Sequence, residues 1–173
     1  MARAPLSLKA RAIGLLAQRE QSRAELRRKL LRIEQQQQQR LSRGVAAQGG
    51  GEGDAPPDEE DAEVGEAAID ALLDALAAQG YLDETRFVES RLHVRASRFG
   101  AQRIQQELAQ HGLKLDAEQQ AALRATELER AREVWLKRFG TEPSRDVAEQ
   151  ARQTRFLLAR GFAPEVVRRL LRA

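Results

Sequence analysis

The stretch GYLDETRFVESRLHVRASRFGAQRIQQELAQHG, residues 80–112, decides the fold. Gly80, Gly100 and Gly112 divide it into two segments, and each segment spaces its apolar residues as a helix does. Asp83 is suited to cap the first helix, and glycine commonly ends a helix. The sequence therefore predicts two helices here, with core residues Phe87, Val88, Leu92, Ala96, Phe99, Ile104 and Leu108.

Helical patterns also precede this stretch. We expect a helix over 7–19, and a second one that opens at Ser22, where Ser22 and Glu25 have the spacing of a capping box. Leu26, Leu30 and Ile33 would be its core residues. A third helix, which resumes near Val64 and stops before Gly80, carries its apolar residues at Ile69, Leu72, Leu73 and Leu76.

Further patterns follow Gly112. Asp116 and Gln119 form a second capping-box pattern, which predicts a helix to Phe139, with a bend. Leu128, Ala131, Trp135 and Phe139 would share one face of it. After the break at 140–143, Ser144 is expected to cap a helix to Ala159. Pro164 suits the first position of a last helix that carries Val167, Leu170 and Leu171.

The chain repeats itself in outline. Residues 107–113 align with residues 156–162, because in both a helix ends at glycine and an apolar residue follows. Residues 22–30 align in the same way with 100–108. We therefore predict an all-α fold of tandem three-helix repeats, stacked into an elongated, curved, solenoid-like body. The repeats would span 1–79, 80–123 and 124–173.

The first repeat is interrupted at about residues 35–63. A run of five glutamines leads into Gly49–Gly51, Pro56-Pro57 and a block of acids. Such a segment has too little apolar surface to offset its ordering entropy, so we predict a flexible insert, with the second helix fraying within a turn or two of the glutamines.

Composition supports helices and limits the function classes. The apolar content is mostly Ala and Leu, and β-branched residues are scarce, which disfavours a large sheet. There is no cysteine, so disulfides and Cys-based zinc sites are excluded. No segment has the length of a membrane span or the apolar run of a signal peptide, so we expect a cytoplasmic protein with no membrane contact.

The net charge of +3 hides an uneven distribution of basic and acidic residues along the chain. Residues 1–43 carry a net +8, residues 44–84 a net −12 and residues 85–173 a net +7. Basic ends around an acidic middle suggest a polyanionic partner, with an acidic segment able to compete for the same surface. A solvated, Arg-rich helical surface is the alternative explanation.

Two groups of cations are the candidate binding residues. Five lie on the second expected helix. Three more, Arg91, Arg95 and Arg98, follow Phe87 at helical spacing, and their like charges repel one another unless an anion neutralises them. Arg103 is a further candidate, although Glu107 one turn later offers it an intrahelical partner. The full candidate set is Arg23, Arg27, Arg28, Lys29, Arg32, Arg91, Arg95, Arg98 and Arg103.

Other side chains favour structural roles. Tyr81, Phe87, Phe99, Trp135 and Phe162 lie at junctions or on apolar faces, which favours core packing over base stacking. His93 and His111 have no acids arranged with them, so we expect no metal and no cofactor. A nucleophile with a positioned base is also missing from the pattern, which predicts a protein that is not an enzyme.

The stretch 80–112 resembles the central motif of the RecX family, through residues 80–87, Arg98-Phe99-Gly100, Arg103-Ile104 and Glu107-Leu108 to Gly112. Residues 22–26, and residues 155–157 with 160–162, fit the family's first and last repeats. The resemblance implies a non-catalytic protein that binds the filament of the RecA recombinase on DNA. It also implies inhibition of strand exchange, ATP hydrolysis and co-protease activity, and hence negative regulation of recombination, repair and the SOS response.

The expected partners are therefore the RecA filament and single- or double-stranded DNA, bound without sequence preference by a monomer. Two alternatives stay open. One is a helix-turn-helix transcriptional regulator, for which residues 101–103 would begin the recognition helix. The other is a helical scaffold that binds only proteins.

Overall fold

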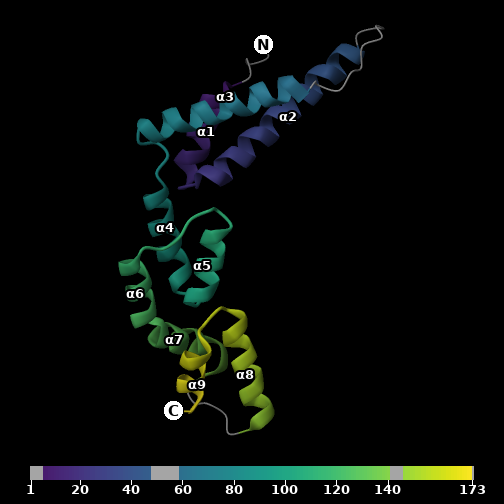
Figure 1. Ribbon diagram of the computed structural model, residues 1–173. Coiled ribbons are helices and arrows are strands. Elements are labelled where there is room, and N and C mark those ends of the chain that lie inside the picture. Colours follow the sequence, from purple (N-terminus) through teal and green to yellow (C-terminus); the bar gives the residue numbers. More distant parts are fainter. Residues whose placement is uncertain (1–5, 48–58, 141–145, 173) are drawn as a thin grey trace. The chain divides into compact units, whose positions relative to one another are not determined.

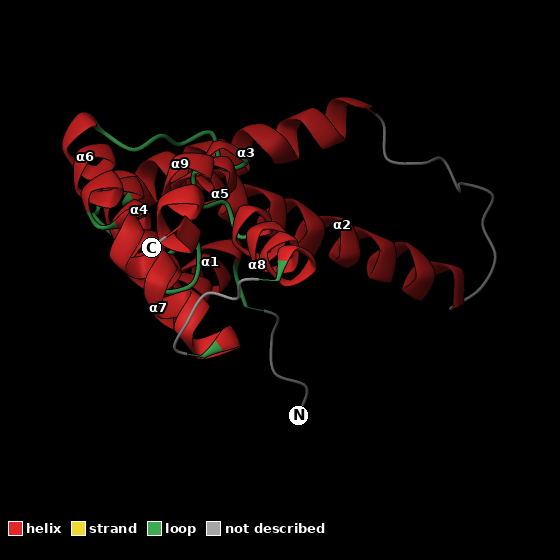
Figure 2. Cartoon of the chain, turned by 90° about the horizontal axis from the view of Figure 1, so that it is seen from below, coloured by secondary structure: helices red, strands yellow, loops and turns green. Residues whose placement is uncertain are grey.

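A computed structural model describes residues 6–47, 59–140 and 146–172, and every regular element in these ranges is an α-helix (Figure 2). The chain forms two compact units, residues 1–84 and 85–173. Three separate hydrophobic clusters, each drawn from three successive helices and their junctions, lie within these units. The prediction of an all-α fold of three-helix repeats is confirmed.

The first unit contains α1 (Leu8–Gln18), α2 (Arg23–Ala47) and α3 (Glu59–Ala78). Ser7 caps α1, and the Ser22 hydroxyl accepts a hydrogen bond from the Glu25 amide at 3.1 Å, as the capping pattern predicts. α2 and α3 lie side by side and run in opposite directions (Figure 1). The buried residues of this unit are Ala12, Leu26, Leu30, Ile69, Leu73, Leu76 and Leu82. Of the predicted core residues, Ile33 and Leu72 are only partly buried.

The helices around the predicted insert are longer than the sequence pattern indicates. α2 continues to Ala47 and α3 begins at Glu59, so residues 35–47 and 59–63 are helical. Residues 48–58 lie outside the described residues. Gln, Arg, Leu and Ala are all good helix formers, so this segment can continue a helix without an apolar face.

The second unit begins with α4 (Glu84–Ala96), α5 (Ala101–Ala109) and α6 (Ala117–Ala125). Asp116 and Gln119 form the complete capping box that their spacing predicts. Gly112 ends the second helix of this repeat with a positive φ of 74°, which only glycine adopts easily. The buried residues are Phe87, Val88, Ala101, Ile104, Leu108, Leu115 and Leu123, with Leu92, Ala96 and Phe99 packed against them.

The last three helices are α7 (Glu127–Phe139), α8 (Val147–Ala159) and α9 (Pro164–Arg172). Pro164 begins the final helix, as predicted. The predicted cap at Ser144 lies outside the described residues, and α8 is capped by Asp146, whose carboxylate accepts from the Glu149 amide at 2.9 Å. The core of this repeat is Ala131, Val134, Trp135, Leu157, Phe162, Val167 and Leu170.

Two sequence expectations need correction. Residues 116–139 do not form one bent helix, because the chain breaks at Thr126 into α6 and α7. The break is stabilised by Arg130, which donates to the Leu123 carbonyl at 2.7 Å and to the Thr126 hydroxyl at 3.2 Å. Tyr81 is not a core residue, since 48% of it is exposed.

The second and third repeats are joined by direct backbone contacts. The Gly100 amide donates to the Arg160 carbonyl at 2.9 Å, and the Gln102 amide donates to the Gly161 carbonyl at 3.2 Å. A Cβ atom added at Gly100 would stand 2.1 Å from the Gly161 carbonyl oxygen. The loop between α4 and α5 and the loop between α8 and α9 therefore pack closely enough to require glycine.

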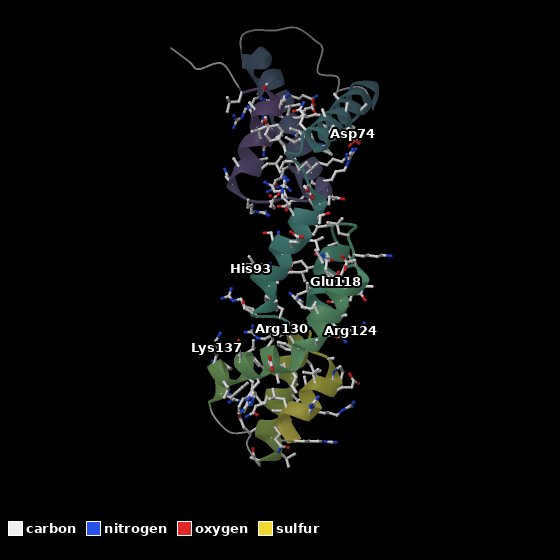
Figure 3. The ribbon with its side chains drawn as sticks, turned by 90° about the vertical axis from the view of Figure 1, so that its left-hand side faces the viewer. Asp74, His93, Glu118, Arg124, Arg130 and Lys137 are labelled. Atoms are coloured by element: carbon white, nitrogen blue, oxygen red, sulfur yellow. The ribbon has the colours of Figure 1, made fainter. Side chains whose placement is uncertain are left out.

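Two charged side chains of α7 complete this junction. Glu127 is only 3% exposed, and one of its oxygens accepts from the Ala101 amide at 3.1 Å and from the Ala163 amide at 3.3 Å. Arg130 donates to the carbonyls of Ala96 and Phe99 at 2.9 and 2.8 Å, and burial lowers its pKa. Figure 3 shows Arg130 where α7 meets the second repeat.

Candidate nucleic-acid and filament interface

The basic residues of α2 that face α3 are paired within the first unit. Arg23 contacts Asp74 at 2.6 Å, and Arg27 contacts Asp70 and Glu66, each at 2.8 Å. The three acids are four residues apart on α3, and so they match the spacing of the two arginines on the neighbouring helix. Figure 3 shows Asp74 on α3 beside α2. The hydrogen bond from Arg27 holds the pKa of the Asp70 carboxyl below its ordinary value.

The remaining candidate cations of α2 differ in exposure. Lys29 contacts the Glu25 carboxylate at 3.0 Å and the Gln21 side chain at 2.8 Å. Burial alone would raise the pKa of Glu25, but hydrogen bonds from Arg19 and Lys29 outweigh burial and lower it. Arg28 and Arg32 are exposed, and neither forms an ion pair with a residue that the structure describes. Of this group, these two are the cations most accessible to a partner.

Glu107 neutralises two of the candidates on α4. Arg91 contacts its carboxylate at 3.2 Å and Arg95 contacts it at 3.0 Å. Each guanidinium also lies over an aromatic ring, Arg91 over Phe87 at 5.1 Å and Arg95 over Phe99 at 5.5 Å. The intrahelical pair suggested for Arg103 is thus not what the structure shows, because Glu107 turns toward α4 instead.

Guanidinium groups from three helices lie close to the Phe99 ring. Arg95 of α4, Arg103 of α5 and Arg160 at the end of α8 lie 5.5, 6.0 and 5.9 Å from its ring centre. Cations at such distances are attracted by the negative face of an aromatic ring. A half-buried phenyl ring therefore gathers arginines from both repeats of the second unit at their junction.

Beside this cluster lies a groove of about 390 Å³, which we call the junction groove. Four cations contribute to it, and Arg98 is the only one among the candidates from the sequence. Lys137, Arg138 and Arg160 were missed, although Arg160 precedes the glycine of a repeated helix end, and that position was a usable signal. The lining residues are Ser97, Arg98, Val134, Lys137, Arg138, Phe156 and Arg160.

The described residues offer little for other kinds of site. No three His, Asp or Glu side chains gather there in a way that would hold a metal ion. None of the helices in the described ranges combines the length and apolarity that crossing a bilayer requires. The chemistry that these surfaces can perform is the binding of anions by arginine and lysine.

Comparison with known proteins identifies the family. Residues 83–121 match the model of the second three-helix domain of RecX, and residues 125–171 match that of its third three-helix domain. The regulatory protein RecX of Leptothrix cholodnii is 47% identical over 172 residues, which cover 98% of this chain and 90% of that relative. The chain belongs to the RecX family of regulatory proteins.

Other RecX proteins align over a similar extent. That of Ralstonia nicotianae is 46% identical and covers 98% of this chain and 89% of its own length. That of Herminiimonas arsenicoxydans is 41% identical and covers 100% of this chain and 96% of its own length. The two RecX domain matches correspond to α4–α6 and α7–α9 within a few residues, so the helices on either side of the junction groove belong to different RecX repeats.

Proposed function

We propose that this RecX family member binds the RecA filament on DNA and lowers its recombinase, ATPase and co-protease activities. Family membership over nearly the whole chain carries the proposal. The surface chemistry supports it, since cations without an acidic partner in the described part of the chain lie on both units, at Arg28 and Arg32 and at Arg98 and Arg103. In this proposal the protein acts by binding in the cytoplasm, as a monomer and without a catalytic step.

The contact with DNA is proposed to be independent of sequence. The exposed cations reach phosphates, and phosphate contacts position a protein without reading bases. Arg23, Arg27, Arg91 and Arg95 are already paired with acids, so each is expected to contribute less to DNA binding. The candidates without an ion pair are expected to contribute more. Strand exchange by the recombinase is the direct assay: added protein should inhibit it, and unaltered exchange over a series of salt and protein concentrations would refute the proposal.

A helix-turn-helix transcriptional regulator is the second candidate, because Gln102 and Arg103 are exposed at the start of α5. Footprinting on genomic fragments separates the two. Protection of one defined sequence would favour the transcriptional regulator, whereas uniform binding that weakens with salt supports the filament modulator.

A further inference from the structure

The junction groove lies where three helices end. Arg98 follows the last turn of α4, Lys137 and Arg138 belong to the last turn of α7, and Arg160 caps α8. None of the groove's lining residues is acidic, and none of the four cations forms a salt bridge within the described ranges. Figure 3 shows Lys137 on α7 at the surface of the second unit.

Helix dipoles explain only part of this accumulation. The carboxyl end of a helix carries roughly half a negative charge, and cations in the last turn are stabilised by it. Three helix ends therefore account for about one and a half of the four positive charges. The remainder is an excess of positive charge that the surrounding described residues leave without an anion.

Arg160 shows that the groove has a fixed cation as well as solvated ones. Its guanidinium lies 4.6 Å from the ring centre of Phe156 and 5.9 Å from that of Phe99. It also donates to the Arg98 carbonyl at 3.3 Å. These contacts hold the guanidinium in place without neutralising its charge, and an arginine held in this way loses less conformational entropy when it binds an anion.

We infer that the junction groove binds the phosphate backbone of a nucleic-acid strand. The guanidinium fork matches two phosphate oxygens, and several cations in one groove suit a ligand that carries successive charges. This inference rests on the proposed function for the source of the strand, which is the DNA within the filament. It goes beyond the proposed function by naming the DNA-binding site, which it assigns to the junction of the second and third repeats and not to the basic helix α2.

The groove contacts phosphates and not bases. Phe156 is its one aromatic residue, and that ring is already in contact with the Arg160 guanidinium and, edge to face at 5.1 Å, with Phe139. A base stacks on an aromatic face only where the face is free. Val134, its other apolar residue, is 6% exposed, so the groove also lacks the apolar anchor that a bound peptide generally uses.

The test is the salt dependence of binding to a labelled oligo(dT) strand, followed by fluorescence anisotropy. The groove variant is Arg98→Gln/Lys137→Gln/Arg138→Gln, in which glutamine preserves helix propensity. The control Lys114→Gln/Arg124→Gln/Arg132→Gln removes the same charge at exposed positions outside the groove. The double variant Lys137→Gln/Arg138→Gln changes only exposed side chains of one helix. It replaces the triple variant in the same assay if the triple variant is unstable.

Each phosphate contact contributes about −0.7 to the slope of log K against log salt for a single strand. The groove triple variant should reduce the magnitude of the slope by about 2 and the double variant by about 1.4. The control should keep the wild-type slope. An abasic strand should bind wild-type protein within about twofold of oligo(dT), because the groove contacts phosphates only.

Four results would overturn the inference. One is a groove variant with the wild-type slope, the second is an equal loss in groove and control variants, and the third is loss of binding to the abasic strand. Polyglutamate that competes as well as oligo(dT) would also overturn it, since the groove would then bind acidic peptides.

The same proteins separate this inference from the proposed function. If wild-type protein binds DNA through the groove but leaves the recombinase unaffected, the proposed function fails and the groove assignment stands. If wild-type protein inhibits the recombinase and the groove variant binds DNA with an unchanged slope, only the groove assignment fails.

Discussion

Gly100 and Gly161 lie in backbone contact, and this contact fixes how the second repeat meets the third. A Cβ atom at Gly100 would approach the Gly161 carbonyl oxygen to 2.1 Å. Gly161 has a φ of 79°, and a Cβ atom there would lie 2.5 Å from the Arg103 backbone nitrogen. A side chain at either glycine would therefore clash with the backbone opposite, and Gly161 also has a φ that other residues rarely adopt.

Gly100→Ala should destabilise the second unit. The φ of −75° at Gly100 is open to alanine, so the whole effect is steric, and we expect a loss of about 1–3 kcal/mol in the free energy of unfolding. Urea denaturation followed by circular dichroism measures it. Gly14→Ala is the matched control, because nothing lies within 4 Å of a Cβ atom there and alanine favours the interior of α1 by about 0.5–1 kcal/mol. Equal stability of Gly100→Ala and wild type would refute the contact.

Glu127→Ala should weaken the same junction by a different mechanism. It leaves the amides of Ala101 and Ala163 without their acceptor, at a cost of about 1–3 kcal/mol for the buried Ala101 amide and less for the part-buried Ala163 amide. Glu127→Gln retains an oxygen at this position and should lose less. Hydrogen exchange at the two amides is the readout, with exposed Glu129→Ala as the control. Unchanged protection in Glu127→Ala would contradict the assigned hydrogen bonds.

The pair of Arg27 and Asp70 should make the first unit sensitive to acid. The pKa of Asp70 is lowered from 3.8 in the folded protein, so its contribution to stability is present above pH 3.8 and is lost as the pH falls through the lower folded value. Glu66 and Asp74 face the same arginines, and arginine stays charged throughout. Thermal unfolding between pH 2 and pH 6 should therefore decline less steeply for Asp70→Asn than for wild type. An equal decline would show that the pair contributes nothing.

Glu107→Gln should expose the positive charge of Arg91 and Arg95. If these arginines belong to the proposed binding surface, removing their shared carboxylate strengthens binding to a DNA oligonucleotide about threefold at low salt. Glu118→Gln makes the same change of charge at an exposed site of α6 and should have less effect (Figure 3). Equal effects of the two substitutions would exclude this part of α4 from the interface.

Features set by a few neighbouring residues were predictable from the sequence. Four such features are the Ser22 cap, the capping box of Asp116 and Gln119, the start of the last helix at Pro164 and the helix end at Gly112. They depend on contacts between residues at most five apart. Their chemistry is local, so a pattern in the chain is enough to reveal it.

Features that depend on tertiary contacts were not predictable in this way. Arg27 reaches Asp70 and Glu66 on another helix, and nothing in the spacing of α2 indicates which helix packs beside it. The junction groove combines Arg98 with Arg160, 62 residues later, so neither repeat by itself shows it. The helical glutamine run of α2 is a related case, because its lack of an apolar pattern conceals a strong local preference for helix.

The most direct test of the account is the DNA-dependent ATP hydrolysis of the RecA recombinase, titrated with this protein. We predict that hydrolysis falls when the protein is present at far less than one copy per recombinase subunit. Hydrolysis that stays at its starting rate up to equimolar protein, at low and at physiological salt, would contradict the central claim that this RecX family member modulates the filament.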